Sequence, residues 1–418
     1  MSAASVRRRY LLLHGLRWFP VGLMVPVLVL LPLGRGLTLA EIGVVAAMQG
    51  LVVLFLELPT GGLADALGRR PVLIAAQVIG IASIAVMTVA HSVALFAVVF
   101  LLQGVYRALD SGPLASWYVD ASLAEDPKAD IETGLSRGGV VIGLAIAGGA
   151  LLSGVLVGTH PVPGMERVLL PVLVSLVIQV VSLVATALLM TENRRGAGGR
   201  GAVLASVRAV PGVIRTAGGL VRRSRVLLAL VSVELLWGFG MVTFETLFPV
   251  RLSEVAGGVD DAAALLGPTG AAAWLASAGG AALVQVAARR IGAQWTGAAL
   301  HVLQALTVVA MALLAGPVGV ITAYLVCYAA HGAANPVYAG LLHRQVDGDH
   351  RTTVLSMASM MSQPAGAAGM VTLTALATAT SVPVAMLVGS VVLALAAPLY
   401  LVGPRPGTAP EPGPAIAT

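Results

Sequence analysis

The sequence is poor in charged residues. Only 11% of its 418 residues are charged, whereas 58% are hydrophobic, and the mean hydropathy is +0.93. Soluble domains are nearer half apolar and a quarter charged. A soluble core of this length has no room for so much apolar surface, so the composition indicates an integral membrane protein.

Cysteine and histidine are also scarce. The single cysteine, Cys327, excludes an intramolecular disulfide framework, and its apolar surroundings in the sequence favour a packing role over a catalytic thiol. The seven histidines do not cluster at metal-binding spacing, and neither a phosphate-binding loop nor a nucleophile elbow is found. We therefore expect no enzyme, no cofactor and no metal site.

Lysine is almost absent. Lys128 is the only lysine among the 25 basic residues. The formal net charge is +6. In so apolar a chain, this excess indicates membrane topology rather than nucleic-acid binding. The expected partners are the lipid bilayer, a small-molecule substrate and protons, with no nucleic acid, and the chain is expected to act as a monomer.

Twelve apolar runs are each long enough to cross the hydrocarbon core of a bilayer. They lack the period-two alternation of barrel strands, so helices are predicted. The first run is too long for a signal peptide and has no small-residue cleavage site, so we interpret it as a retained helix. The runs are Tyr10–Leu33, Leu39–Thr60, Pro71–Ala90, Val93–Val119, Gly138–Gly158, Val168–Met190, Val226–Val250, Ala263–Ala288, Thr296–Leu314, Val318–Leu342, Val354–Ala377 and Val382–Val402.

The basic residues predict the orientation. With both termini in the cytoplasm, 20 of the 25 basic residues fall on the inner side, as the positive-inside rule requires. Arg35, Arg167 and Arg251 fall outside, and Arg17 and Arg107 lie within spans. The Ala, Val, Gly and Arg usage suggests a bacterial source, so the predicted location is the bacterial cytoplasmic (inner) membrane.

The longest connection divides the spans six and six. The predicted units are residues 1–190, a central loop 191–225, residues 226–403 and a Pro-rich disordered tail 404–418. Apolar residues of the central loop recur at three- and four-residue steps from Val203 to Val221. They predict a basic amphipathic helix on the inner membrane surface. A loosely ordered basic linker is the alternative.

A short polar interruption, 57–72, separates the second and third spans. Its residues Gly61, Asp65, Gly68, Arg69 and Arg70 follow the pattern Gly-x-x-x-Asp-x-x-Gly-Arg-Arg. This resembles the signature loop between helices 2 and 3 of the major facilitator superfamily. The resemblance implies an all-α polytopic membrane protein, with twelve transmembrane helices in two pseudo-symmetric six-helix bundles. It also implies that this cluster latches an inner gate, whereas the simpler alternative is a turn that anchors two helices.

The residue types in this loop have physical reasons of their own. Asp65 can face the positive N-terminal end of a helix that begins near Arg351, where Thr352 or Thr353 would be a cap. Arg69 and Arg70 are expected at the inner headgroups, where they can pair with Asp65 or Asp120.

The fourth span carries two charges. Arg107 and Asp110 stand three residues apart, so they are predicted to share a helix face and neutralise each other. An ionisable pair inside a span indicates transport or coupling, and a purely structural pair is the alternative. The run from Ala108 to Asp120 resembles a bacterial (actinobacterial-like) drug or metabolite efflux subgroup, although Arg107 precedes Gly112 by five residues rather than the usual four.

The fifth span is rich in glycine. The spacings Gly139–Gly143 and Gly154–Gly158 predict close helix crossings. Gly139 and Gly148 fit the first spacing of an antiporter motif of the superfamily, but the later Gly-Pro of that motif is missing.

The resemblance further implies that helices 1, 4, 7 and 10 line a cavity. Candidates there for proton coupling or substrate binding are Arg17, Arg107, Asp110 and Glu245. Further possible cavity residues are Glu57, Trp18, His331 and Asn335. The alternatives left open are an exposed Glu at a helix end for Glu245 and for Glu234, and a packing histidine for His331.

These observations predict a secondary transporter. We expect proton-coupled efflux of a small, partly apolar organic compound by alternating access. A nutrient importer of the same fold is the alternative, followed by a non-transporting membrane sensor or a polytopic membrane enzyme.

Overall fold

The computed structural model describes residues 2–192, 219, 222, 224–345 and 351–403, and for residues 57–59, 61–62, 65–66 and 351–360 it describes the backbone alone. All regular elements in these parts are helices. The predicted central-loop helix and the Pro-rich tail lie outside the described residues. The elements are α1 (Ala3–Met24), α2 (Leu30–Gly34), α3 (Leu39–Leu67), α4 (Arg69–Val89), α5 (Val93–Asp110), α6 (Pro113–Glu125), α7 (Ile131–Thr159), α8 (Leu169–Leu189), α10 (Arg225–Gly240), η1 (Thr243–Leu247), α11 (Phe248–Ala256), α12 (Val259–Ile291), α13 (Ala293–Leu313), α14 (Pro317–His343), α15 (Arg351–Ala379), α16 (Val382–Leu395) and η3 (Ala397–Leu401).

These helices account for the twelve predicted spans. Four spans are interrupted, and each is built from consecutive elements: α1 with α2, α5 with α6, α10 with η1 and α11, and α16 with η3. Within the described residues, ten of the spans are long and apolar enough by themselves to cross a membrane. The predicted fold class, an all-α polytopic membrane protein with six and six spans, is confirmed.

Local sequence sets where the helices begin. Ser92, Ser224 and Ser381 each cap a helix by accepting a hydrogen bond from the backbone three residues later. Gly68 joins α3 to α4 by a tight turn without a loop. Its φ of +95° lies in the left-handed region, which glycine adopts at little cost.

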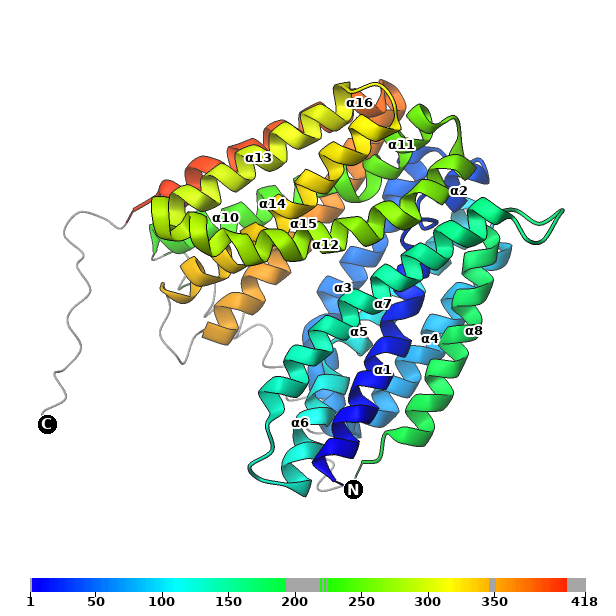
Figure 1. Cartoon of the computed structure of the whole chain (residues 1–418), viewed down its shortest axis with the longest axis vertical. Helices are drawn as coiled ribbons and strands as arrows, with labels where there is room; N and C mark the ends of the chain where they lie inside the picture. The colour runs from blue at the N-terminus through cyan, green and yellow to red at the C-terminus, as the bar shows by residue number, and fades with distance from the viewer. Residues whose placement is uncertain (1, 193–218, 220–221, 223, 346–350, 404–418) are drawn as a thin grey trace, which may run out of the picture.

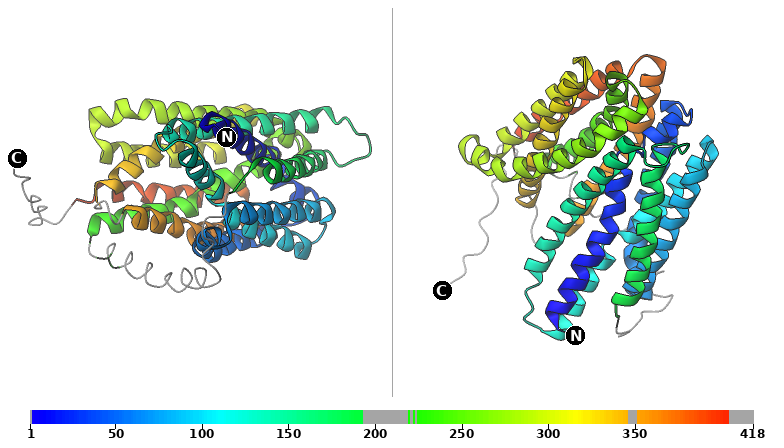
Figure 2. Two further views of the ribbon diagram at one scale, coloured as in Figure 1. Left: turned by 90° about the horizontal axis from the view of Figure 1, so that it is seen from below. Right: turned by 45° about the vertical axis from the view of Figure 1, so that its right-hand side comes forward.

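The spans form two bundles that meet at an angle (Figures 1 and 2). Eight spans make a closed ring by successive contacts, in the order α1, α7, α12, α14, α10, α15, α3 and α5. The ring is closed between α5 and α1 by the ion pair of Arg17 with Asp110. The other four, α4, α8, α13 and α16, pack on the outside of their own bundle. The inner sides of the ring helices are therefore the part of each bundle that faces the other.

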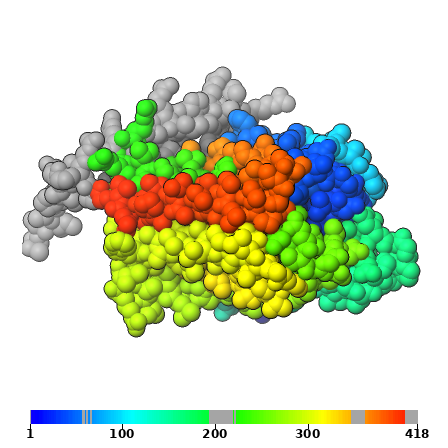
Figure 3. Space-filling view, turned by 90° about the horizontal axis from the view of Figure 1, so that it is seen from above, coloured from blue at the N-terminus to red at the C-terminus, as the bar shows by residue number. Residues whose placement is uncertain are grey.

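The bundles touch at one end, which we call the closed end. There Gly154 of α7 crosses Gly267 of α12, and a Cβ added at Gly267 would lie 2.6 Å from the Cα of Gly154. On the other side of the ring, Gly43 of α3 packs equally tightly against Thr374 of α15. The ion pair of Arg167 with Asp260, at 3.6 Å, also joins the two bundles. Viewed from above, blue residues of the first bundle lie directly against orange residues of the second (Figure 3).

The bundles diverge toward the end that carries the N-terminus, which we call the open end (Figure 1). Gly139 and Gly143 of α7 and Gly279 of α12 have no atom within 4 Å of an added Cβ. The crossing predicted from Gly154 is confirmed, whereas the one predicted from Gly139 and Gly143 is wrong for this arrangement, because α7 and α12 have separated by that depth.

Gly267→Val is expected to prevent the closed end from closing. A valine side chain does not fit between the backbones of α7 and α12, so the population should shift away from the observed arrangement. Distances between spin labels at Arg167 and Asp260 measure this shift, and we expect a longer, broader distribution. Gly279→Val, on the same helix and facing open space, is the matched control, and equal effects of the two variants would contradict the assignment.

Candidate functional site

A buried ion pair joins the first and fourth spans. The helix α5 ends at Asp110, after which Ser111 and Gly112, with φ of +94°, lead into Pro113 at the start of α6. Arg17 pairs with the Asp110 carboxylate, and its Nη2 also donates to the Asp110 carbonyl at 3.2 Å. The side chains are only 6% and 14% exposed. Arg17 thus neutralises the Asp110 carboxylate and also donates to a carbonyl freed by the end of the helix.

The predicted pairing of Arg107 with Asp110 is wrong. Asp110 turns toward α1, where Arg17 neutralises it. Arg107 is exposed, and within the described part of the chain it forms no ion pair. The i, i+3 spacing suggested a shared face, but the partner of Asp110 comes from another helix.

Arg107 faces the opposite bundle. At a rotation of 100° per residue, it lies on α5 between Asp110, which contacts α1, and Gly104, which packs against Val52 of α3. Since α1 and α3 are the ring neighbours of α5, the face between them is the inner side of the ring. Phe100, two turns earlier on the same stripe and nearer the closed end, is buried, so the stripe becomes accessible toward Arg107.

The second bundle presents a carboxylate from its seventh span. Glu245 lies in η1, a π-helical turn of the seventh span, and accepts a hydrogen bond of 2.5 Å from the hydroxyl of Tyr328 on α14. Glu245 is exposed although Phe244 and Thr246 on either side of it are buried. No described cation lies within ion-pair distance of it. A π-turn of this kind often marks a functional position, since it rotates one side chain out of the regular helical register.

Aromatic rings continue from Glu245 along the contact of α10, η1 and α11 with α14. Tyr324 stacks on Phe248 with centroids 3.6 Å apart, and Tyr328 lies 4.7 Å from Tyr324. His331 stacks on Trp237 at 5.3 Å. We call these five residues, together with Phe244, the aromatic ladder.

Only His331 of the aromatic ladder was predicted from the sequence. For Tyr324 and Tyr328, the signal in the sequence was their i, i+4, i+7 spacing with His331 on one helix face. Asn335 follows on the same face and is exposed. The stacking on Trp237 supports a packing role for His331, whereas Asn335 is free to meet a ligand. In the first bundle Trp18, next to Arg17, is half-buried with its indole Nε1 unpaired.

The signature loop is tied to two acidic side chains. Arg69 pairs with Asp120, as predicted, and donates to the Ser116 carbonyl at 2.8 Å. The backbone amides of Arg69 and Arg70 donate to the two carboxylate oxygens of Glu192, at 2.8 and 3.2 Å. The side chains of Asp65 and Glu57, and those at the start of α15, lie outside the described residues, so the predicted latch between Asp65 and α15 stays a prediction.

Glu192 was not singled out by the sequence. It caps the N-terminus of α4 from more than a hundred residues away, where its negative charge meets the positive helix end. Glu192→Ala is expected to destabilise this junction by about 0.5–2 kcal/mol, the usual value of a helix cap, and hydrogen exchange at the amides of Arg69 and Arg70 should accelerate. Glu132→Ala, an exposed substitution in the first turn of α7, is the control, and unchanged exchange in Glu192→Ala would contradict the capping role.

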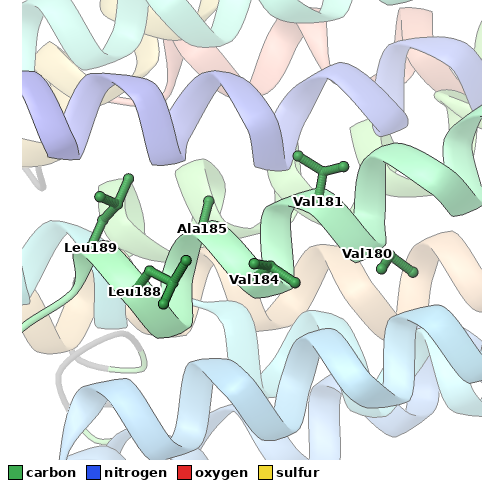
Figure 4. Close-up of a pocket in the computed structure, with 6 residues that line it drawn as sticks. All are labelled: Val180, Val181, Val184, Ala185, Leu188 and Leu189. Carbon is green, nitrogen blue, oxygen red and sulfur yellow. The ribbon is translucent and has the colours of Figure 1, made fainter.

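A pocket of about 390 Å³ lies apart from this site. It is on the outer face of α8, lined by Val180, Val181, Val184, Ala185, Leu188 and Leu189 (Figure 4). This apolar surface belongs to a helix outside the ring, where a membrane protein meets lipid. No group of metal-ligating side chains occurs among the described residues.

Two bundles of six spans that are joined at one end and diverge at the other are an architecture of membrane transporters. The family model of the Major Facilitator Superfamily matches residues 10–370, and the chain belongs to that superfamily. It is therefore a transporter rather than an enzyme.

Solved structures share the fold at low sequence identity. The nucleoside transporter NupG aligns with a TM-score of 0.78 and 12% identity, covering 95% of this chain and 98% of its own. A POT family transporter in complex with a thioalcohol-conjugated peptide gives 0.68 and 12%, covering 96% and 95%. A bacterial homolog of the human lysosomal transporter Spinster, in an inward-facing and occupied conformation, gives 0.72 and 12%, covering 95% and 96%. A comparison with curated protein sequences finds no match.

Proposed function

We infer that the chain is a proton-coupled exporter of a small, partly apolar organic compound, working by alternating access as a monomer in the bacterial cytoplasmic membrane. The resemblance of the fourth span to an efflux subgroup supports export. The observation that carries the coupling is Glu245, an exposed carboxylate of the second bundle whose hydrogen-bond partner among the described residues is the hydroxyl of Tyr328. Such a group is able to hold either a proton or a cationic part of the substrate, but not both at once.

The distribution of basic residues supports the orientation. Arg69 and Arg70, like the N-terminal arginines, belong to the open end. Under the positive-inside rule this end faces the cytoplasm, so both termini are cytoplasmic and the arrangement described above is inward-open. The contacts of Gly154 with Gly267 then form the outer gate, and the signature loop belongs to the inner gate.

Competition at Glu245 gives the transport cycle its coupling. In the inward-open state the substrate binds and displaces a proton into the cytoplasm. The bundles then rock, the inner gate closes and the outer gate opens, and a proton from outside displaces the substrate. Each step changes the occupancy of one carboxylate, so substrate and proton cross in opposite directions.

Purified protein in detergent tests this proposal directly. Compounds that raise the unfolding temperature are added to lightly buffered protein, and the pH is recorded. Antiport predicts that each such compound releases protons from the protein, and that the release disappears when the bath pH is high enough for the carboxyl to be deprotonated before the compound binds. Binding without any proton release would overturn the coupling.

Import is the competing function. It requires substrate and proton to move in the same direction, so binding of one should favour binding of the other. Proton uptake on substrate addition, rather than release, would favour an importer.

A further inference from the structure

The two bundles present opposite charges to each other. In the first bundle, Arg17 is neutralised by Asp110, which leaves Arg107 as an exposed cation on the inner side of the ring. In the second bundle, Glu245 is an exposed carboxyl group whose hydrogen-bond partner, Tyr328, is neutral, so it becomes an anion when it gives up its proton. The bundles thus offer ionisable groups of opposite sign, and neither Arg107 nor Glu245 forms an ion pair within the described residues.

The two charges lie at similar depth. Arg107 comes 14 residues after Val93, where α5 starts at the closed end, so it lies about 21 Å below that end at 1.5 Å per residue. Glu245 comes 11 residues before Ala256, where α11 ends at the closed end, which places it about 16 Å deep by the same rise. The difference is about one helical turn, so the two charged side chains stand at nearly the same level of their bundles.

The surroundings of Glu245 favour an apolar body beside the charge. Two rings of the aromatic ladder, Trp237 and His331, are only half-buried, and His331 lies 5.9 Å from Tyr328, the hydrogen-bond partner of Glu245. Aromatic faces attract both apolar groups and cations. On the Arg107 side, the exposed planar guanidinium suits a carboxylate, which it binds through two parallel hydrogen bonds.

We propose that the substrates are zwitterions, in which a carboxylate binds Arg107, a cationic amine binds Glu245, and an apolar or aromatic body lies against the aromatic ladder. This rests on the transport function inferred above and names its substrate class. A molecule of one charge leaves the other protein charge unpaired when the bundles close around it, which is costly in a low-dielectric site. A zwitterion pairs both protein charges and links the two bundles. It therefore stabilises the state in which the bundles have closed around it more than the open state.

A matched series of compounds tests the class. Phenylalanine and a phenylalanyl dipeptide are each prepared with free ends, as the C-terminal amide, as the N-acetyl derivative and with both ends blocked. Binding is measured by the unfolding temperature of the full chain in detergent. We expect at least one free zwitterion to bind, and each single blocking to weaken its binding by at least about tenfold. If no free zwitterion binds, or if a singly charged form binds as tightly, the proposal is overturned.

Charge-removing variants assign each end of the substrate to its residue. Arg107→Gln should abolish the penalty for blocking the carboxylate and keep the penalty for blocking the amine, and Glu245→Gln should do the reverse. Arg137→Gln, which removes an exposed charge on α7, is the control and should keep both penalties. The same pattern of penalties in all three variants would overturn the assignment even if zwitterions bind.

Proton release distinguishes this proposal from the function on which it rests. Zwitterions that bind and exchange across vesicles without any proton movement would overturn proton coupling and leave the substrate class standing. Singly charged compounds that release protons on binding while zwitterions do not would overturn the substrate class and leave proton-coupled transport standing.

Discussion

Glu245→Gln is expected to abolish the proton release that accompanies substrate binding. Glutamine keeps the size of the side chain and still accepts the hydrogen bond from Tyr328, but it no longer exchanges a proton for the substrate. We expect release to fall from about one proton per bound substrate to none, measured with a pH dye in lightly buffered detergent solution. Substrate binding itself should weaken, so the comparison is made at saturating ligand.

Glu254→Gln is the matched control for this experiment. Glu254 lies 9 residues further along the same span, at the closed end, where it pairs with Arg251 at 2.9 Å on the surface. Proton release should be unchanged in Glu254→Gln. Equal release from wild type and Glu245→Gln would show that another group carries the proton.

Arg17→Met is expected to cause the largest loss of stability in the chain. The substitution leaves Asp110 as a buried carboxylate without a cation and leaves the carbonyl at the end of α5 without a donor. Breaking one side of a buried ion pair typically costs about 3–5 kcal/mol. Thermal unfolding in detergent should therefore show a large fall in the unfolding temperature, without any dependence on substrate.

A double variant separates loss of the charge pair from loss of packing. Arg17→Met combined with Asp110→Leu removes both charges, and an apolar pair of similar volume often replaces a buried ion pair without loss. We expect the double variant to recover most of the stability lost in the single one. A double variant as unstable as Arg17→Met would mean that the cost arises from packing around Arg17 rather than from the unpaired Asp110.

The fold was predictable from the sequence because membrane spans are defined by length and apolarity, which are local properties. The twelve runs reappear as twelve spans, and the signature loop placed Arg69 near Asp120 correctly. The residue types of the loop, with Gly68 allowing a turn without a linker, were by themselves enough to indicate the superfamily.

The pairings within the site were not predictable, because they join helices far apart in the chain. The i, i+3 spacing suggested that Arg107 neutralises Asp110, but the break of the helix at Ser111 turns Asp110 toward Arg17 on another span. Glu245 was named from its position alone. The π-turn that exposes it, and the hydroxyl of Tyr328 that binds it, depend on packing between α14 and the seventh span.

The conformation was equally beyond the sequence. The glycines of α7 have the same spacing at Gly139 and at Gly154, but only Gly154 meets α12 in the described arrangement. Which of two similar crossings is formed depends on how the bundles are tilted, and a transporter must be able to change that tilt.

Proton flux across reconstituted vesicles tests proton-coupled export most directly. The chain is reconstituted, a pH gradient is imposed at zero membrane potential, and both the substrate and the internal pH are followed. Antiport predicts that substrate accumulates on the acidic side against its own gradient, while protons leave that side in a fixed ratio to the substrate. Accumulation on the alkaline side, or transport that ignores the pH gradient, would contradict the account.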